Sequence, residues 1–424
     1  MLKILMILVS LLLSVAAQAK GVIKHGQHGQ HGQHGSGSTS MGSTGDGQFN
    51  PYVAADPRGG FFVLHVERVG KVSNLVLRHS TDGVTFSAPV RVNDVPGQAA
   101  VRNENPPKML VGLQGDLYVT WADEREKWKG NIHFARSTDG GKSFSPALTI
   151  NSDAALPPVG HAFQSMAIDR KGRIFIAWID ERNKTKEDRG AEIWMAVSED
   201  RGRTFSADRR IISDVCECCR TIMQIDQTGN IYVAYRTVPR EGKMLRDIVV
   251  ARSMDGGKSF TPSAVSQDGW EINGCPVVGP GMTINRSGVI TITWFVGGGD
   301  GGRPGLYHAS SSDGGKSYSP RRLLIEEQRM AKHSHVFSLP DGRTLLAWDD
   351  AGENSQTITF WGHLNLSRAR DTANGAAGSS KPGVIGSQAG VSYPIVAVNG
   401  RQGMVVGLQP GKTEIFTRSF QLPD

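Results

Sequence analysis

The chain has 424 residues, of which 38% are hydrophobic and 21% are charged, and its formal net charge is +7. The positive charge is spread along the chain without a block of lysines and arginines, so no nucleic-acid partner is expected. Long apolar stretches with helical periodicity are absent, and the 52 glycines accompany frequent polar turn residues, which favours an all-β chain.

The N-terminal residues 1–19 have the layout of a secretory signal peptide. Lys3 precedes an apolar run from Ile4 to Val15, and the small residues Ala17 and Ala19 follow as a cleavage site. The run is too short to cross a bilayer as a helix. We therefore expect residues 1–19 to be removed and the protein to be periplasmic or secreted, without a stable membrane anchor. An uncleaved anchor is the alternative interpretation.

Residues 20–48 form a histidine- and glycine-rich segment that we expect to be flexible. Its regularly spaced histidines are His25, His28, His31 and His34. Imidazoles on a glycine-rich chain are typical of a low-affinity metal trap, which predicts binding of copper or zinc. A solvated linker is the alternative interpretation.

Five later segments share a serine, an aspartate two residues on, one or two glycines and a closing aromatic residue. The copies are Ser80–Phe86, Ser137–Phe144, Ser198–Phe205, Ser253–Phe260 and Ser311–Tyr318. Their aspartates are 57, 61, 55 and 58 residues apart, and a shared period of this size indicates a stacked or circular array. Each aspartate is expected to accept backbone N–H groups in a tight turn, with the aromatic residue as an apolar plug that locks its hairpin.

Each repeat also contains short apolar strands joined by glycine turns, and four such strands make one propeller blade. The first strands begin near Asn50, Asn105, Ala162, Cys219, Gly279, His335 and Tyr393. We predict an all-β propeller over residues 49–424, with seven four-stranded antiparallel blades preferred and six as the alternative. Only three strands are visible in the seventh unit, so a segment before Gln48 or within residues 380–392 is expected to complete it. A monomer is expected.

The repeated turn resembles the Asp-box, or bacterial neuraminidase repeat, of the sialidase superfamily, over nearly the whole mature chain. The resemblance implies a β-propeller, although known sialidases have six blades. Non-enzymatic propellers share the motif, so the fold alone does not assign an activity. For an enzyme, the resemblance implies three arginines for a substrate carboxylate, an aspartate as acid/base and a tyrosine nucleophile assisted by a glutamate.

The sequence supplies that enzymatic set incompletely. The Arg-Ile-Pro motif that normally provides the first arginine is missing from residues 48–56. The remaining catalytic candidates are Arg102, Asp123, Asp180, Arg220 and Tyr393. Two of them, Asp123 and Asp180, repeat in phase within Trp-x-Asp-Glu-Arg, which favours structural ion pairs in turns over catalysis.

The start of a propeller's inner strand lies at its central channel, and one set of residues gathers at this level of the sequence. The set comprises His161, Cys216, Cys218, Cys219, Cys275, His333 and His335. Thiolates and imidazoles together suit copper or zinc, which predicts a central metal site. Two disulfides, one of them joining Cys275 to the Cys216–Cys219 group, are the main alternative, and a redox-active mixture is the third.

Two functions follow from these patterns. The first is an exported sialidase-like propeller that binds or handles a metal ion through the central cysteines and histidines, or binds a small molecule or glycan there. The second is a secreted glycoside hydrolase of the exo-sialidase type.

Overall fold

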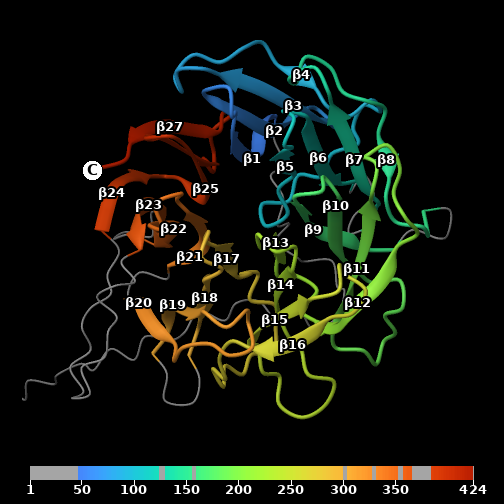
Figure 1. Cartoon of the computed structure of the whole chain (residues 1–424), viewed down its shortest axis with the longest axis vertical. Helices are drawn as coiled ribbons and strands as arrows, with labels where there is room; N and C mark the ends of the chain where they lie inside the picture. Colours follow the sequence, from blue (N-terminus) through green and yellow to red (C-terminus); the bar gives the residue numbers. More distant parts are fainter. Residues whose placement is uncertain are drawn as a thin grey trace, which may run out of the picture.

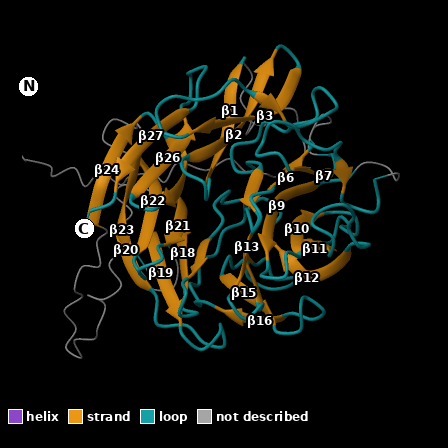
Figure 2. Ribbon diagram, turned by 45° about the horizontal axis from the view of Figure 1, so that its top comes forward, coloured by secondary structure: helices purple, strands orange, loops and turns teal. Residues whose placement is uncertain are grey.

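The protein is a ring of seven β-sheets in the computed structural model (Figure 1). Residues 46–123, 129–154, 159–298, 303–326, 331–351, 357–364 and 383–423 are described. These ranges contain strands, turns and loops but no helix (Figure 2), and hence no helix that could cross a membrane. The predicted signal peptide and the histidines at positions 25, 28, 31 and 34 lie outside the described residues.

In every blade the strands pair antiparallel, in chain order from the centre of the ring outward. The first blade consists of β1 (Gly47–Ala55), β2 (Phe61–Val69), β3 (Val72–Ser80) and β4 (Val90–Arg91). The second consists of β5 (Lys108–Val111), β6 (Leu117–Ala122), β7 (Ile132–Ser137) and β8 (Leu148–Thr149). The third consists of β9 (His161–Ile168), β10 (Ile174–Asp180), β11 (Ala191–Ser198) and β12 (Arg209–Val215).

The other four blades continue the pattern. The fourth consists of β13 (Ile222–Ile225), β14 (Ile231–Arg236), β15 (Ile248–Ser253) and β16 (Thr261–Ala264). The fifth consists of β17 (Gly281–Ile284), β18 (Ile290–Val296), β19 (Gly305–Ser311) and β20 (Arg322–Glu326). The sixth consists of β21 (Lys332–Ser338), β22 (Thr344–Ala351), β23 (Thr357–Leu364) and β24 (Gly383–Ala389). The seventh consists of β25 (Ser392–Asn399), β26 (Gln402–Leu408) and β27 (Phe416–Gln421).

The ring closes by contact between the first and last blades. Strand β1 packs against β25 and β26, and the inner strands surround the centre in Figure 1. The Gln48 N–H donates to the Thr413 carbonyl at 2.8 Å, and Asn399 Nδ2 donates to the Asp56 and Gly60 carbonyls at 2.6 and 3.0 Å. The prediction of seven blades is therefore confirmed, and the arrangement of six blades plus a hairpin is wrong.

The seventh sheet has three strands among the described residues, and the expectation that residues 380–392 complete it is wrong. Gly383–Ala389 instead forms the outermost strand of the sixth blade, where it pairs antiparallel with β23. The outer edge of β23 would otherwise present unpaired backbone groups, and this segment covers it.

The Asp-boxes are hydrogen-bonded turns, as expected, but they also join neighbouring blades. In the second blade, Asp139 Oδ1 accepts two backbone N–H groups at 3.0 Å, and Ser137 Oγ accepts the Gly141 N–H at 2.8 Å. Gly141 has φ of 86°, and a Cβ there would lie 2.6 Å from Leu77 of the preceding blade. Phe205 of the next box packs on Phe134 of the blade before it, with ring centroids 4.9 Å apart. The aromatic plug therefore fills the space between blades and does not merely lock its own hairpin.

The second strand of each blade forms the hydrophobic core. Every residue of β6, β10, β14 and β18 is buried, because both faces of these strands pack against adjacent sheets. This packing holds the inner strands at fixed positions around the centre, which allows loops at their starts to position side chains on a common axis.

Candidate functional site

The inner strands of four blades begin with the same backbone irregularity. Asn50, Phe163, His333 and Tyr393 have φ of 53°, 56°, 46° and 54°, and the strand register shifts beside each of them. This left-handed conformation costs a non-glycine residue about 1 kcal/mol or more. The bulge also changes the direction in which the side chain of that residue points. Such strain is concentrated at functional sites, so the repeated bulges direct attention to the start of the inner strands.

Side chains from three of the seven blades and from the loops between blades converge beside these bulges. We call Glu104, Lys108, Arg220, His333, Asp349 and Tyr393 the axial cluster. Glu104, which precedes β5, reaches across the ring and accepts the Gly279 N–H before β17 at 3.2 Å. Arg220, which precedes β13, lies 3.9 Å from the Glu104 carboxylate and donates to the Ser334 carbonyl at 3.2 Å.

Asp349 organises the part of the cluster that belongs to the sixth and seventh blades. His333 Nδ1 lies 2.7 Å from Asp349 Oδ2, and the same oxygen accepts the Tyr393 N–H at 2.7 Å. The His333 and Tyr393 rings stack with centroids 3.9 Å apart. Although burial acts to raise the pKa of Asp349, the His333 ring and its hydrogen bond hold that pKa below its usual value. Asp349 therefore fixes the orientation of the His333 ring and the position of the Tyr393 backbone.

The Nε2 side of His333 faces the other carboxylate. His333 Nε2 lies 3.7 Å from Glu104 Oε2, a buried oxygen that has no hydrogen-bond partner. Burial, with the negative charges of Glu104 and Asp349, raises the pKa of the Tyr393 phenol, so this group stays protonated at neutral pH. The cluster thus contains an oriented imidazole and a neutral phenol in contact with each other.

Cations complete the cluster. Burial lowers the pKa of Lys108 to about 7, with Arg220 acting in the same direction and Glu104 against it. A hollow at the start of the inner strands is lined by Asn50, Asn103, Pro106, Arg220 and Tyr393. A lysine whose charge is poorly compensated, next to an arginine that borders a hollow, is suited to an anionic ligand.

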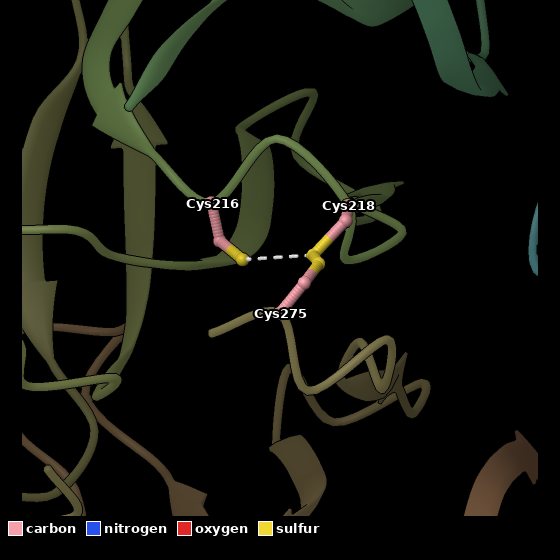
Figure 3. Close-up of side chains that lie close together, drawn as sticks. All are labelled: Cys216, Cys218 and Cys275. Atoms are coloured by element: carbon pink, nitrogen blue, oxygen red, sulfur yellow. Dashed lines mark hydrogen bonds between the residues drawn. A yellow bond between two sulfur atoms is a disulfide. The ribbon is translucent and has the colours of Figure 1, made fainter. Parts of the chain in front are cut away.

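The four cysteines form a separate group, which we call the sulfur cluster. A disulfide joins Cys218, before β13, to Cys275, before β17, and so links the fourth and fifth blades. Cys216 Sγ lies 3.6 Å from Cys218 Sγ (Figure 3). Its distance to Cys219 Sγ is 3.3 Å. The hydrogen bond with Cys219 lowers the pKa of Cys216 to about 6 against the effect of burial, whereas burial raises the pKa of Cys219.

The predicted histidine ligands are not part of the sulfur cluster. In the described residues, groups of three or more ligand atoms within 4.8 Å are Cys216, Cys218 and Cys275, and Asp153, His161 and Asp180. His161 lies 3.2 Å from Asp153 and 3.3 Å from Asp180, next to the Arg182 guanidinium that already pairs with both carboxylates. The mixed cysteine–histidine centre expected from the sequence is therefore divided, because consecutive blades direct these residues to different neighbours.

The other two predicted histidines belong to the axial region. His333 is a member of the axial cluster, and His335 Nδ1 lies 3.4 Å from the Val396 N–H. Burial lowers the pKa of His335 to about 3, and the Arg220 and Lys108 cations act in the same direction. His335 is therefore neutral and held in the wall behind the cluster.

The structure brings together only some of the catalytic candidates that the sequence suggested. Arg220 and Tyr393 meet in the axial cluster. Arg102 is buried, with its guanidinium carbon 5.5 Å from the Phe163 ring centroid. Asp180 pairs with Arg182 at 2.7 Å, the ion pair expected for that motif, and Asp123 lies 3.5 Å from His133 Nε2.

Sequence reasoning missed Glu104, Lys108 and Asp349. Glu104 stands just before a first strand, so a search of those positions for carboxylates as well as for sulfur and imidazole would have found it. Lys108 is the first residue of β5. The alternation of side chains along a strand does not by itself tell to which face the side chain of its first residue points. Asp349 ends the second-strand motif Leu-Ala-Trp-Asp of the sixth blade, and only the register of β22 on β21 places it beside His333.

A second hollow lies between the third and fourth blades. It is lined by charged residues that include Asp188, Asp214 and Arg240. Arg240 Nε bonds to Asp214, and Asp188 accepts the Thr185 N–H at 2.9 Å. The lining of this hollow carries charged groups but no histidine or tyrosine, so it lacks the proton-transfer pair of the axial cluster.

Comparison with known proteins supports the fold. The family description "BNR repeat-like domain" matches residues 115–423, and no curated protein matches the chain. Polysaccharide lyase Uly1 is 9% identical, with a TM-score of 0.54 and 94% of each chain covered. A polysaccharide lyase PL25 ulvan lyase, solved bound to -[GlcA(1-4)Rha3S]-, is 12% identical, with a TM-score of 0.53 over 91% of this chain and 99% of its own. The Hadza microbial sialidase Hz136 is 13% identical, with a TM-score of 0.49 over 84% of this chain and 74% of its own.

The likeness to the two lyases shows a shared propeller fold at low identity. The family match spans well over half of the chain and includes four of the five Asp-boxes. The resemblance of the repeated turn to the sialidase superfamily is thereby confirmed, and the chain belongs to the BNR repeat-like domain family of sialidase-like propellers.

Proposed function

We propose that the protein is an exported carbohydrate-active enzyme whose axial cluster binds a carboxylate-bearing sugar and cleaves its glycosidic bond by β-elimination. The main support is the contact between His333 and Tyr393, two proton-transfer groups held on left-handed bulges, beside the Arg220 and Lys108 cations. The lyase of like fold that was solved with a GlcA-containing saccharide provides a precedent for an anionic glycan on such a propeller.

The chemistry requires three tasks, and the cluster has a group for each. Arg220 and Lys108 neutralise the uronate carboxylate, which makes the proton on the adjacent carbon more acidic. His333, oriented through Nδ1 by Asp349, removes that proton with Nε2. The electron pair forms the new carbon–carbon double bond, the glycosidic oxygen leaves from the neighbouring carbon, and the protonated Tyr393 phenol donates a proton to it.

Hydrolysis by a pair of carboxyl groups fits the cluster less well. Such hydrolysis needs two carboxyl groups on either side of the bond that breaks. Asp349 is buried and its Oδ2 is occupied by the His333 ring and the Tyr393 N–H. It is therefore not free to face a substrate.

A sialidase-type hydrolase is the second candidate, because Tyr393 lies in the field of both Glu104 and Arg220. This grouping corresponds to the tyrosine–glutamate pair and one of the three arginines that the resemblance implies. Arg102, the other predicted arginine, is directed at Phe163. The set of three arginines is thus incomplete within the described residues.

The test is to incubate the full-length protein with ulvan, alginate and polygalacturonate and to follow the ultraviolet absorbance of the unsaturated uronate product. We expect activity on at least one polymer and a loss of 100-fold or more in the His333→Ala variant. His363→Ala is the matched control, because His363 lies in the third strand of the same blade, where it pairs with Leu345 and its ring lies near Arg343 and Asp341. Absence of the unsaturated product from every polymer refutes the elimination.

A fluorogenic sialoside distinguishes the second candidate. If the protein releases the fluorophore without forming an unsaturated product, and the Tyr393→Phe variant does not release it, the activity is hydrolysis and not elimination. Inactivity on sialosides of several linkages refutes the sialidase-type hydrolase.

A further inference from the structure

The sulfur cluster contributes no group to the proposed reaction and has features that a structural disulfide does not need. Two loops contribute to it, one before β13 and one before β17, and both are anchored on blades of the rigid ring. Cys216 and Cys219 are fully buried, Cys218 is 7% exposed, and Cys275 is partly exposed. The neighbours of the sulfurs are Val238, Met244 and Val277, so the group sits in an apolar pocket.

We propose that the four cysteines form a redox-controlled site for one soft metal ion, Cu(I) or Zn(II), which binds when the Cys218–Cys275 disulfide is reduced. Four thiolates are the donor set that these ions prefer. The histidines that the sequence suggested as additional ligands take no part in it.

The spacing of the sulfurs fits this site. Four sulfurs at about 2.3 Å from a tetrahedral ion lie about 3.8 Å from one another. Cys216 Sγ lies 3.3 Å from Cys219 Sγ and 3.6 Å from Cys218 Sγ, and the sulfurs of Cys216, Cys218 and Cys275 all lie within 4.8 Å of one another. Cys219 is not in that group of three, so its side chain must rotate toward Cys218 and Cys275 to complete a coordination sphere. The Cys218 and Cys275 sulfurs, which are bonded here, must separate on reduction.

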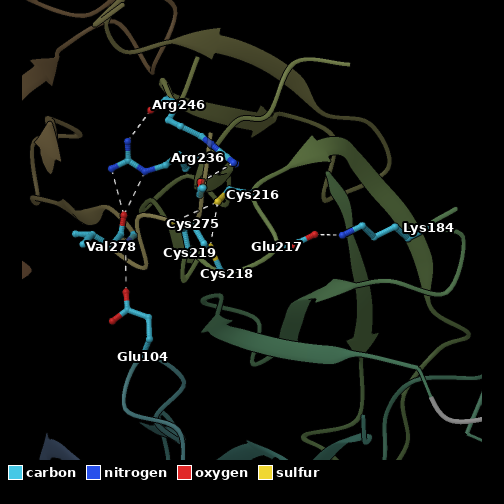
Figure 4. The surroundings of a disulfide bond; sticks show 12 residues. Glu104, Lys184, Cys216, Glu217, Cys218, Cys219, Arg236, Arg246, Cys275 and Val278 are labelled. Carbon is cyan, nitrogen blue, oxygen red and sulfur yellow. Dashed lines mark hydrogen bonds and ion pairs between the residues drawn. A yellow bond between two sulfur atoms is a disulfide. The ribbon is translucent and has the colours of Figure 1, made fainter. Parts of the chain in front are cut away.

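The surroundings compensate the negative charge of four thiolates. Arg236 and Arg246 are buried next to the cluster (Figure 4), and the Arg246 Nε has no hydrogen-bond partner. The N–H groups of Cys218 and Val278 donate to the sulfurs of Cys216 and Cys219. Cations and N–H donors around the ligands are the usual second layer of a thiolate metal centre.

Glu217 is not a ligand, although it stands between two of the cysteines. Its carboxylate pairs with Lys184 of the third blade and is directed away from the sulfurs in Figure 4. The loop therefore presents sulfur alone to the pocket.

The redox step balances with an external dithiol. Dithiothreitol supplies two electrons and two protons to the Cys218–Cys275 bond, which becomes two thiols, while the reagent becomes a cyclic disulfide. Binding of the ion then releases the thiol protons to solvent. Oxidised glutathione accepts two electrons from the Cys218 and Cys275 thiolates and two protons from solvent and becomes two thiols, which re-forms the disulfide, removes two ligands and expels the ion.

The test compares the same full-length protein in two states. Protein reduced with dithiothreitol under nitrogen, then freed of reductant, is equilibrated with Cu(I) against the chelator bicinchoninate, and separately with Co(II) as a spectroscopic substitute for Zn(II). We expect one ion per chain and a sulfur-to-metal charge-transfer band in the reduced protein, and at least tenfold weaker binding in the reoxidised protein. This comparison requires no variant to fold.

Variants assign the ligands. Cys216→Ser/Cys219→Ser should lose the charge-transfer band, whereas Met244→Leu, a change of the apolar wall, should keep it. Replacement of His25, His28, His31 and His34 by alanine should remove only binding that lacks this band. Absence of the band from the reduced protein, equal binding in the two redox states, or an unchanged band in the double serine variant each refutes the site.

Discussion

Replacement of Asp349 by asparagine is the most informative single change in the axial cluster. The Asp349 carboxylate accepts both the His333 imidazole and the Tyr393 N–H, and it is 4% exposed. Hydrogen bonds to a charged group contribute about 1.5–3 kcal/mol each. An asparagine keeps one acceptor for the Tyr393 N–H but loses the charge-assisted bond with His333, so the free energy of unfolding should fall by about 2 kcal/mol.

The effect of this substitution should depend on pH. The folded-state pKa of Asp349 is lowered, so its stabilisation is complete above the unfolded value of about 3.9 and is lost as the pH falls through the folded pKa. Urea unfolding followed by tryptophan fluorescence should therefore show the full difference between wild type and Asp349→Asn at pH 7 and a smaller difference near pH 3.

Asp341→Asn is the matched control. Asp341 lies in the turn between β21 and β22 of the same blade, where its half-exposed carboxylate pairs with Arg343. An exposed pair contributes less than about 1 kcal/mol. Equal losses in the two variants, or a difference for Asp349→Asn that is constant from pH 3 to pH 7, would contradict the assigned role of Asp349.

Three further changes test the box, the axial lysine and the closure of the ring. Ser137→Ala leaves the buried Gly141 N–H without its acceptor and should lower the free energy of urea unfolding by about 1–3 kcal/mol, more than the exposed control Ser143→Ala. Between pH 7 and 10 the unfolded chain binds more protons than the folded one at Lys108, so stability should rise with pH there, and Lys108→Met should abolish the rise. Below pH 7 the charged Lys108 should strengthen binding of a uronate oligosaccharide, and calorimetry that shows no such dependence would count against this role. Asn399→Ala removes two hydrogen bonds between the first and last blades and should speed limited proteolysis at that junction, whereas an unchanged rate means that closure depends on apolar contacts alone.

The number and type of blades could be predicted because the local rules and the period agree. The hydrogen bonds of each box come from residues within the box, such as Ser137 and Asp139, so the turn can be recognised locally. The spacing of the aspartates then gives the length of the repeating unit. The last blade was harder, because β24 reaches the sixth sheet after the stretch of residues 365–382, and no local pattern states which edge a distant strand will cover.

The site could be predicted only in part. The expectation that functional residues lie at the start of the inner strands identified Arg220, His333 and Tyr393, and these three residues belong to the same cluster. It failed for His161, because that ring faces Asp153 and Asp180 and is not grouped with the sulfurs. Glu104 and Gly279 are 175 residues apart in sequence, and their contact depends on the width of the ring, which no sequence pattern specifies.

The two proposed sites share their backbone, and this links their chemistry. Arg220 follows Cys219 directly, and Gly279, whose N–H donates to Glu104, lies four residues after Cys275. A Cβ on Gly279 would lie 2.2 Å from the Arg220 carbonyl, so the two segments touch without space for a side chain. The disulfide joins the segment that carries Arg220 to the segment that carries Gly279. The same two segments supply Arg220 and the Gly279 N–H to the axial cluster. Because close-packed interiors transmit strain, we expect a change in the state of the sulfurs to alter the position of Arg220 relative to Glu104. Reduction or metal binding at the sulfur cluster should therefore change the affinity of the axial cluster for its anionic ligand.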